Sequence, residues 1–269
     1  MSQARQPVFT EENGVSFHNM LVTTEYVDIP AGPAPMRMFV AAPKASGRYP
    51  GIVCYSDIFQ LTGPMLRACT RLASYGFVAA APEIYYQIEP PGSVIPFDDA
   101  GRNRGLEDAA KSLVAHFDEG RRAALDYLAK HPSVAAGKLG AMGFCIGGHL
   151  AFRAALEPDV RATVRFYGTG IHDGKLGRDQ DAGSLQRVGE IRGELLMGFG
   201  TEDPHVPSEG RTAIDRKLRD AGVNYSIQLF PSEHAFMRDE GPRFDAEATD
   251  QAFAAMIALF RRVFRHSYT

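Results

Sequence analysis

The sequence predicts an α/β protein with a mainly parallel central sheet and helices on both of its faces. Segments typical of strands alternate with segments typical of helices from Gly51 to the end of the chain, and that order is characteristic of a covered parallel sheet. The length of 269 residues and the hydrophobic fraction of 45% suit one globular core. We therefore expect a single domain over residues 18–269, preceded by a loose arm over residues 1–17.

The first half of the chain is expected to begin with two strands, residues 23–29 and 36–41, because glycine and proline mark a turn between them. Two short apolar runs, residues 51–55 and 77–81, have the composition of strands that are buried in a parallel sheet. A helix over residues 65–75 is expected between these two runs.

The second half of the chain continues the alternation after an irregular segment. Residues 84–105 are rich in proline, glycine and aspartate, and we expect a loop that is long enough to be functional. One long helix, straight or kinked, is expected over residues 106–130. The remaining strands are expected over residues 138–144, 162–167, 194–198 and 225–230, and the remaining helices over residues 149–156, 210–221 and 246–265.

Composition argues against several classes of protein. The net charge of -3 and the pI near 6.2 favour neither nucleic acid nor an anionic membrane as a partner. We find no apolar run of a signal peptide and none long enough to span a bilayer. Three cysteines do not suggest a disulfide scaffold, so we expect a reduced, cytoplasmic protein. No motif for a metal or a nucleotide cofactor is present, and we expect neither.

The strongest chemical signal is the turn over residues 143–148, Gly-Phe-Cys-Ile-Gly-Gly, between a predicted strand and a predicted helix. It matches a nucleophile elbow with cysteine in place of serine. Glycines relieve the crowding of such a turn, and the helix N-terminus favours a thiolate at Cys145. The backbone N–H of Ile146 would be free to bind an oxyanion. Taken alone, the pattern is equally compatible with a buried structural cysteine.

Two further loops follow predicted strands in the order that an elbow requires. In the first loop, Asp203 would orient a histidine. It could instead form an Asx turn before proline. Glu202 and His205 are the neighbouring alternatives for the catalytic role. His234 would be the base, although a single loop histidine is commonly an ordinary surface residue. The joint occurrence of the three motifs favours a catalytic set of Cys145, Asp203 and His234.

Shorter stretches outside these loops add to the pattern: residues 50–53 (Pro-Gly-Ile-Val), 57–59 (Asp-Ile-Phe), 81–85 (Ala-Pro-Glu-Ile-Tyr), 166–168 (Phe-Tyr-Gly) and 234–236 (His-Ala-Phe). Together with the elbow, they make the chain resemble the dienelactone hydrolase family, also called carboxymethylenebutenolidases, from about residue 23 to residue 265. The cysteine is the most specific mark, because most α/β-hydrolases have serine there. The resemblance implies an α/β-hydrolase fold and the hydrolysis of a small carboxylic ester or lactone without a cofactor.

The resemblance also implies roles for individual residues. Cys145 would attack the carbonyl, His234 would be the base, and Asp203 would orient it. The N–H groups of Ile146 and Ile58 would form the oxyanion hole.

Asp57 stands where the family usually has a glutamate that contacts the resting thiol. The resemblance therefore implies that Asp57 modulates the thiol, although its side chain is one methylene shorter. From the residues alone, Asp57 could equally cap the segment that follows it.

Substrate contacts are implied as well. Arg238 matches one of two arginines that bind the substrate carboxylate in the family, whereas Gln87 stands near the place of the second. A weaker anion site is therefore expected, with aromatic surface from Tyr85 beside it. Arg102 or Arg104 could replace the missing arginine, and each of these arginines could instead be a solvated surface residue.

Two alternatives to hydrolysis use the same residues. An activated Cys145 would also serve a redox or electrophile sensor, and a blocked active site would leave a binding scaffold. Cys54 and Cys69 fall on predicted buried elements and suggest no resolving partner. The ordered set of three motifs therefore favours hydrolysis, and the oligomeric state stays open.

Overall fold

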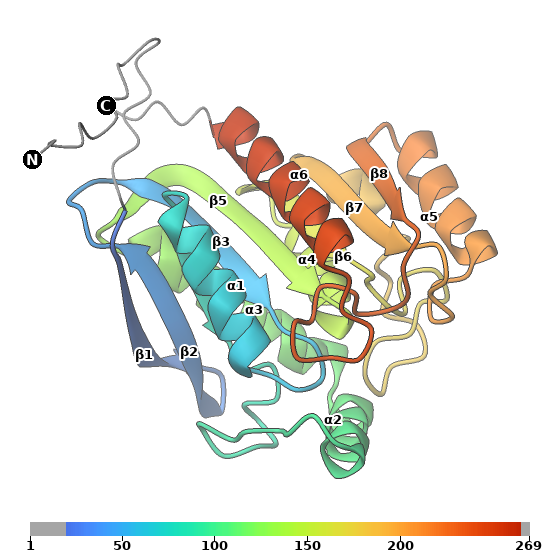
Figure 1. Ribbon diagram of the computed structural model, residues 1–269, viewed down its shortest axis with the longest axis horizontal. Helices are drawn as coiled ribbons and strands as arrows, with labels where there is room; N and C mark the ends of the chain where they lie inside the picture. The colour runs from blue at the N-terminus through green and yellow to red at the C-terminus, as the bar shows by residue number, and fades with distance from the viewer. Residues whose placement is uncertain (1–19, 265–269) are drawn as a thin grey trace, which may run out of the picture.

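A computed structural model of the chain describes residues 20–264 (Figure 1). The predicted arm over residues 1–17 lies outside the described residues. The strands are β1 (Val22–Ala31), β2 (Ala34–Pro43), β3 (Tyr49–Tyr55), β4 (Val78–Pro82), β5 (Val134–Phe144), β6 (Val160–Phe166), β7 (Glu194–Gly200) and β8 (Asn224–Phe230). The helices are α1 (Gly63–Ser74), α2 (Asp99–Lys111), α3 (Val114–Lys130), α4 (Ile146–Ala154), α5 (Ser208–Asp220) and α6 (Ala246–Phe264), with a 3-10 turn η1 (Val188–Glu190).

The eight strands within residues 20–264 form one sheet in the order β1-β2-β4-β3-β5-β6-β7-β8. Neighbouring strands are parallel from β4 to β8. β1 pairs antiparallel with β2, and β2 pairs antiparallel with β4. The prediction of a mainly parallel sheet is therefore confirmed, with the first two strands added at one edge.

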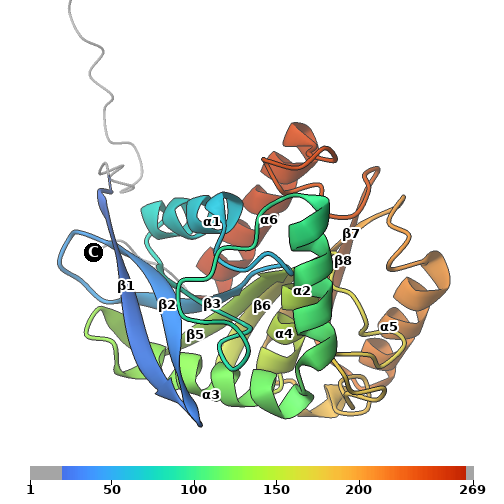
Figure 2. The same ribbon diagram turned by 90° about the horizontal axis from the view of Figure 1, so that it is seen from below.

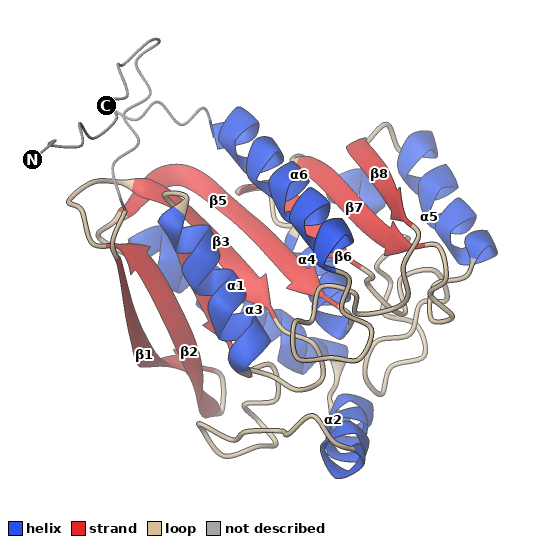
Figure 3. Cartoon of the chain, in the orientation of Figure 1, coloured by secondary structure: helices blue, strands red, loops and turns tan. Residues whose placement is uncertain are grey.

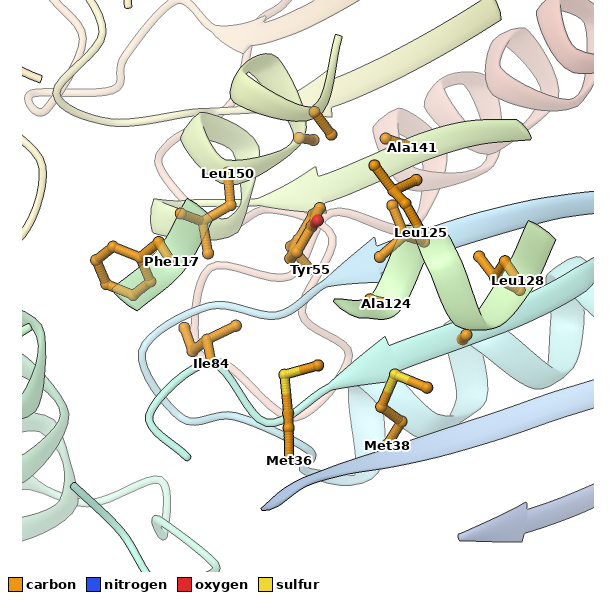
Figure 4. Close-up of a cluster of buried hydrophobic side chains, with 14 of the residues drawn as sticks. Met36, Met38, Tyr55, Ile84, Phe117, Ala124, Leu125, Leu128, Ala141 and Leu150 are labelled. Atoms are coloured by element: carbon orange, nitrogen blue, oxygen red, sulfur yellow. The ribbon is translucent and has the colours of Figure 1, made fainter. Parts of the chain in front are cut away.

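Helices cover both faces of this sheet (Figures 1 and 2). α1 and α6 pack on one face, where Leu72 and Phe260 belong to the same buried cluster. α3 and α4 pack on the other face, where Leu125 and Leu150 meet Tyr55 of β3 (Figure 4). Because both faces are covered, the central strands are apolar along most of their length, as in other parallel sheets.

The predicted helix over residues 106–130 is wrong in its extent, because two helices occupy this region. α2 already begins at Asp99, where the Asp98 carboxylate accepts the N–H of Gly101 at 2.7 Å. It ends at Lys111, and the hydroxyl of the C-cap residue Ser112, whose backbone is extended, donates to the carbonyl of Asp108 at 2.9 Å. Aspartate is a favourable helix N-cap, so Asp98 is a local signal for the start of a helix. The signal lies inside the segment that the sequence predicted to be a loop.

α2 lies beyond the carboxyl ends of the parallel strands, apart from the helices that cover the sheet (Figures 1 and 3). The loops after β3, β5, β7 and β8 open toward the same edge. Side chains at successive strand ends are therefore brought together there, as expected for an open α/β sheet.

Candidate active site

A cavity of about 270 Å³ opens at the carboxyl edge of the sheet. Its lining comes from the segments after β3, β5, β6, β7 and β8, and from one side of α2. Cys145 and His234 both line it. The motifs of Cys145 and His234 thus line the same cavity, and Asp203 contacts His234 from outside the cavity lining.

Cys145 occupies a strained turn between β5 and α4. Its backbone has φ 56° and ψ −124°, in the left-handed half of φ space that non-glycine residues rarely adopt. A Cβ on Gly143 would lie 1.9 Å from the carbonyl oxygen of Gly147, and one on Gly147 would lie 2.2 Å from that of Ser56. Glycine is therefore required at both flanking positions, as in a nucleophile elbow.

Asp203 and His234 form a buried pair. Nδ1 of His234 lies 2.8 Å from Oδ2 of Asp203, and the side chains are 6% and 0% exposed. Oδ1 of Asp203 accepts the backbone N–H of His205 at 2.8 Å. Asp203 thus makes both of the contacts considered for it, because one oxygen closes an Asx turn while the other contacts the histidine. Glu202 is exposed on the same loop.

The charges around His234 favour its protonated form. Burial by itself lowers the pKa of His234, but the charge of Cys145 and hydrogen bonds with Asp203 and Cys145 raise it to about 9. Burial likewise raises the pKa of Asp203, but the hydrogen bond and charge of His234 outweigh it and lower that pKa. These interactions favour an imidazolium at His234 and a carboxylate at Asp203.

Two backbone N–H groups lie where an oxyanion hole is expected. Ile58 belongs to the turn after β3, Ile146 is the first residue of α4, and both line the cavity. Neither N–H donates to an acceptor within residues 20–264. Both donors are therefore available to a ligand beside Cys145.

Asp57 contacts Arg238 and its own turn. Oδ1 accepts the N–H of Phe59 at 2.9 Å, and Oδ2 accepts Nε and Nη2 of Arg238 at 3.0 and 2.6 Å. The Arg238 guanidinium lies 4.8 Å from the ring centre of Phe59 and 5.0 Å from that of Phe97. In the described part of the chain, Asp57 therefore makes the capping contact and an ion pair, with no hydrogen bond to Cys145.

The substrate contacts expected for Tyr85 and Gln87 do not agree with their positions. Tyr85 is 1% exposed and donates its hydroxyl to the carbonyl of Gly105 at 3.1 Å. The amide of Gln87 donates to Glu119 at 2.8 Å. Neither residue lines the cavity. Both side chains instead pack the segment between β4 and α2 against the body of the domain.

Sequence reasoning missed Tyr167 as a neighbour of His234. Tyr167 follows β6 with φ 41°, and its ring meets that of His234 edge to face, with centroids 5.1 Å apart. In the sequence, only the family resemblance draws attention to residues 166–168. His205 was weighed merely as an alternative acid, yet its ring contacts that of His234 at 4.6 Å and lines the cavity.

No described helix is long and apolar enough to cross a membrane. Among residues 20–264, no group of three or more potential metal ligands is placed to hold an ion. His149, which follows the elbow, is fully buried on α4 and bonds Ser184 at 2.8 Å, away from the cavity lining.

The eight-stranded sheet, its helical layers and the sharp turn between β5 and α4 define an α/β-hydrolase. The comparisons with known proteins narrow this class. The model of the dienelactone hydrolase family matches residues 36–264, so the chain belongs to that family and is a hydrolase.

Individual relatives agree with the family. A Saccharomyces cerevisiae protein named "Putative carboxymethylenebutenolidase" is 36% identical over 257 residues, covering 91% of this chain and 94% of the relative. The carboxymethylenebutenolidase of Pseudomonas sp. strain P51 is 28% identical, covering 81% and 87%. The crystal structure of a dienelactone hydrolase-like promiscuous phosphotriesterase from metagenomic libraries is similar with a TM-score of 0.74 and 25% identity, covering 90% and 98%.

Proposed function

We propose that the protein hydrolyses a small carboxylic ester or lactone through a thioester on Cys145. His234 carries the proton in this proposal, and Asp203 orients it. The observation behind the proposal is the convergence at one cavity of a strained elbow cysteine and a histidine held at Nδ1 by a buried carboxylate, at 2.8 Å. Because Nδ1 is occupied, Nε2 is the ring nitrogen that exchanges protons with Cys145 and substrate.

Acylation begins when the thiolate of Cys145 attacks the carbonyl carbon, and the carbonyl electrons move to oxygen. The N–H groups of Ile58 and Ile146 stabilise that oxyanion. When the intermediate collapses, the C–O bond breaks and the imidazolium of His234 protonates the departing alkoxide. In a lactone the alkoxide stays attached to the acyl chain, so ring opening leaves one linear acyl-enzyme.

Deacylation uses the same groups in the opposite proton direction. Neutral His234 removes a proton from water, and the hydroxide attacks the thioester carbonyl. Collapse releases the carboxylic acid and returns the thiolate beside a protonated histidine. Asp203 stays ionised throughout, because its role is to stabilise the imidazolium.

The size of the cavity supports a small substrate. A volume of about 270 Å³ is at the lower end for ligand sites in proteins. The relatives named as carboxymethylenebutenolidases point to a lactone ring within that range. Arg238 contributes a cation that is already paired with Asp57, so we assign this ion pair to shaping the oxyanion side of the cavity.

The alternative function is that of a redox or electrophile sensor. A redox sensor commonly needs a second thiol that reacts with the oxidised Cys145. Cys54 and Cys69 are both 0% exposed in the core, which does not favour either as a resolving thiol. The expected cytoplasmic location stays a prediction.

Acylation by p-nitrophenyl acetate tests the proposal. We expect a burst of p-nitrophenol, an acetyl group that peptide mass spectrometry locates on Cys145, and a loss of turnover by roughly three orders of magnitude or more in Cys145→Ala. Cys69→Ala, which changes a buried thiol on α1, is the matched control and should keep the burst. Undiminished turnover in Cys145→Ala would end the proposal, and peroxide-dependent modification without acylation would favour the sensor.

A further inference from the structure

A second histidine lies against His234 in the cavity. His205 follows β7 and lines the cavity, and its ring contacts that of His234 edge to face, with centroids 4.6 Å apart. His205 is also exposed to solvent. It therefore lies where the cavity adjoins both His234 and the surrounding water.

The position of His205 is fixed although the residue is exposed. Its backbone N–H donates to Oδ1 of Asp203 at 2.8 Å, and Oδ2 of the same carboxylate contacts His234 at 2.8 Å. The next residue, Val206, is 0% exposed in the core. The two histidines are therefore held relative to one another by one carboxylate and by a buried neighbour.

The ring nitrogens of His205 are free to bind a ligand. In residues 20–264, His205 makes its hydrogen bonds through the backbone, and its ring has no hydrogen-bond partner. Burial of one side of the ring lowers the pKa of His205, and the charge of His234 lowers it further. The charges of Arg243 and Arg102 act in the same direction, whereas that of Asp203 opposes them. The neutral ring is therefore favoured, and one of its nitrogens accepts a hydrogen bond.

Hydrogen-bond acceptors are scarce in the lining of this cavity. Four of the lining side chains are cations: Arg102, Lys175, Arg238 and Arg243. Arginine and protonated lysine donate hydrogen bonds but accept none. Besides Cys145 and His234, only His205 and Thr169 bring a side-chain acceptor to the lining within the described part of the chain.

We propose that His205 positions the water that hydrolyses the acyl-enzyme, by accepting a hydrogen bond from it. This inference rests on the proposed function. The leaving group departs beside His234, and water then takes the same place, because one ring nitrogen serves both steps. That place adjoins His205.

The two hydrogens of this water have different fates. One is transferred as a proton to Nε2 of neutral His234 while the oxygen attacks the thioester carbonyl carbon. The other is hydrogen-bonded to His205 and stays with the oxygen. When the C–S bond breaks, the thiolate of Cys145 leaves and this hydrogen belongs to the released carboxylic acid. His205 exchanges no proton, so it is a positioning residue.

Methanol separates this role from general support of the active site. Methanol has one O–H hydrogen, which His234 must remove, and none is left for His205. Loss of the acceptor should therefore slow the attack of water on the acyl-enzyme more than the attack of methanol. With p-nitrophenyl acetate in buffer that contains methanol, the initial ratio of methyl acetate to acetate measures this competition, whichever step limits turnover.

Variants of His205 test the need for an acceptor. His205→Phe keeps an aromatic ring against His234, and we expect it to raise the ratio of methyl acetate to acetate by roughly three- to tenfold, the effect of one lost hydrogen bond. His205→Gln keeps an acceptor and should lie closer to wild type. Glu202→Gln, an exposed neighbour on the same loop, is the matched control and should leave the ratio unchanged.

An unchanged ratio in His205→Phe would overturn the proposal. So would an equal rise in His205→Gln, or a rise that only Thr169→Val produces. Failure of the proposed function has a different signature, because wild-type Cys145 would then carry no acetyl group and the enzyme would form no methyl acetate.

Discussion

The carboxylate of Asp203 contacts a loop and the ring of His234 at the same time. Oδ1 closes the turn at His205, and Oδ2 contacts His234 at 2.8 Å. Since both contacts are made by one short, buried side chain, the position of His234 is tied to the conformation of the loop after β7. A longer side chain at position 203 would have to give up one of the two contacts.

The protonation of His234 predicts the alkaline limit of activity. The pKa of about 9 means that the imidazolium, which protonates the leaving alkoxide in the proposed mechanism, is lost as the pH rises through that value. We expect kcat/KM to fall above about pH 9. In Asp203→Asn, one of the influences that raise this pKa is removed, so the limb should move to lower pH and activity should drop strongly.

The measurement is the pH profile of kcat/KM on a neutral ester between pH 6 and 10. Glu202→Gln, an exposed neighbour on the same loop, is the control and should retain the wild-type limb. An alkaline limb that stays in place in Asp203→Asn would show that another group controls it.

At the scale of elements, the elbow depends on the close approach of α4 to β3. A Cβ on Gly147 would meet backbone oxygens of Ser56 and Tyr55 at 2.2 and 2.4 Å. Backbone atoms at the end of a central strand cannot rotate away as a side chain can. The segment that carries Ile58 begins directly after that strand, so the geometry of the proposed oxyanion hole is coupled to position 147.

We therefore expect Gly147→Ala to destabilise the protein by about 1–3 kcal/mol and to reduce kcat on p-nitrophenyl acetate by more than tenfold. Urea unfolding and steady-state kinetics measure the two effects. Gly189→Ala in η1 is the matched control, because a Cβ there meets nothing within 4 Å. A Gly147→Ala protein with wild-type kcat would show that the turn tolerates a side chain.

α2 carries a buried carboxyl group, that of Asp108. Asp108 is 4% exposed, and one of its carboxylate oxygens has no hydrogen-bond partner among the described residues. Burial, a hydrogen bond with Glu89 and the charge of Glu89 raise the pKa of Asp108 to about 6. The same helix presents Arg102 to the cavity, so this carboxyl group lies within an element that shapes the cavity.

At the scale of the whole molecule, Asp108 should make the free energy of unfolding depend on pH. Its pKa is higher in the folded protein than the ordinary value of 3.8, so folding favours the protonated form. Stability from this group is complete below about pH 4 and is lost as the pH rises through about 6. Asp108→Asn keeps the neutral shape, and we expect it to stabilise the protein by about 1–3 kcal/mol at pH 7.5.

Urea unfolding at pH 4.5 and 7.5 tests this expectation. The increase in the free energy of unfolding caused by Asp108→Asn should be smaller at pH 4.5 than at pH 7.5. Asp126→Asn, at an exposed position on α3, should have the same effect on this free energy at both pH values. An equal effect of Asp108→Asn at both pH values would mean that the carboxyl group does not titrate in this range.

The sequence by itself determined the order of the strands along the chain, the parallel sheet and the three chemical loops, but not the division of residues 99–130 into two helices. These features depend on short-range signals: apolar runs, glycines around Cys145, and Asp203 and His234 directly after strands. Parallel strands end at one edge of a sheet, so residues at successive strand ends meet without any knowledge of the packing. The elbow cysteine also identified the family that the comparisons then confirmed.

Only the tertiary structure decided which charges face the cavity. The sequence does not distinguish Arg102 from Arg104. In the structure, Arg104 binds Glu89, whereas Arg102 lines the cavity beside Cys145. Tyr85 turned into the core, and Asp57 bound Arg238. Each of these outcomes depends on a partner far away in the chain, and local sequence patterns carry no information about such partners.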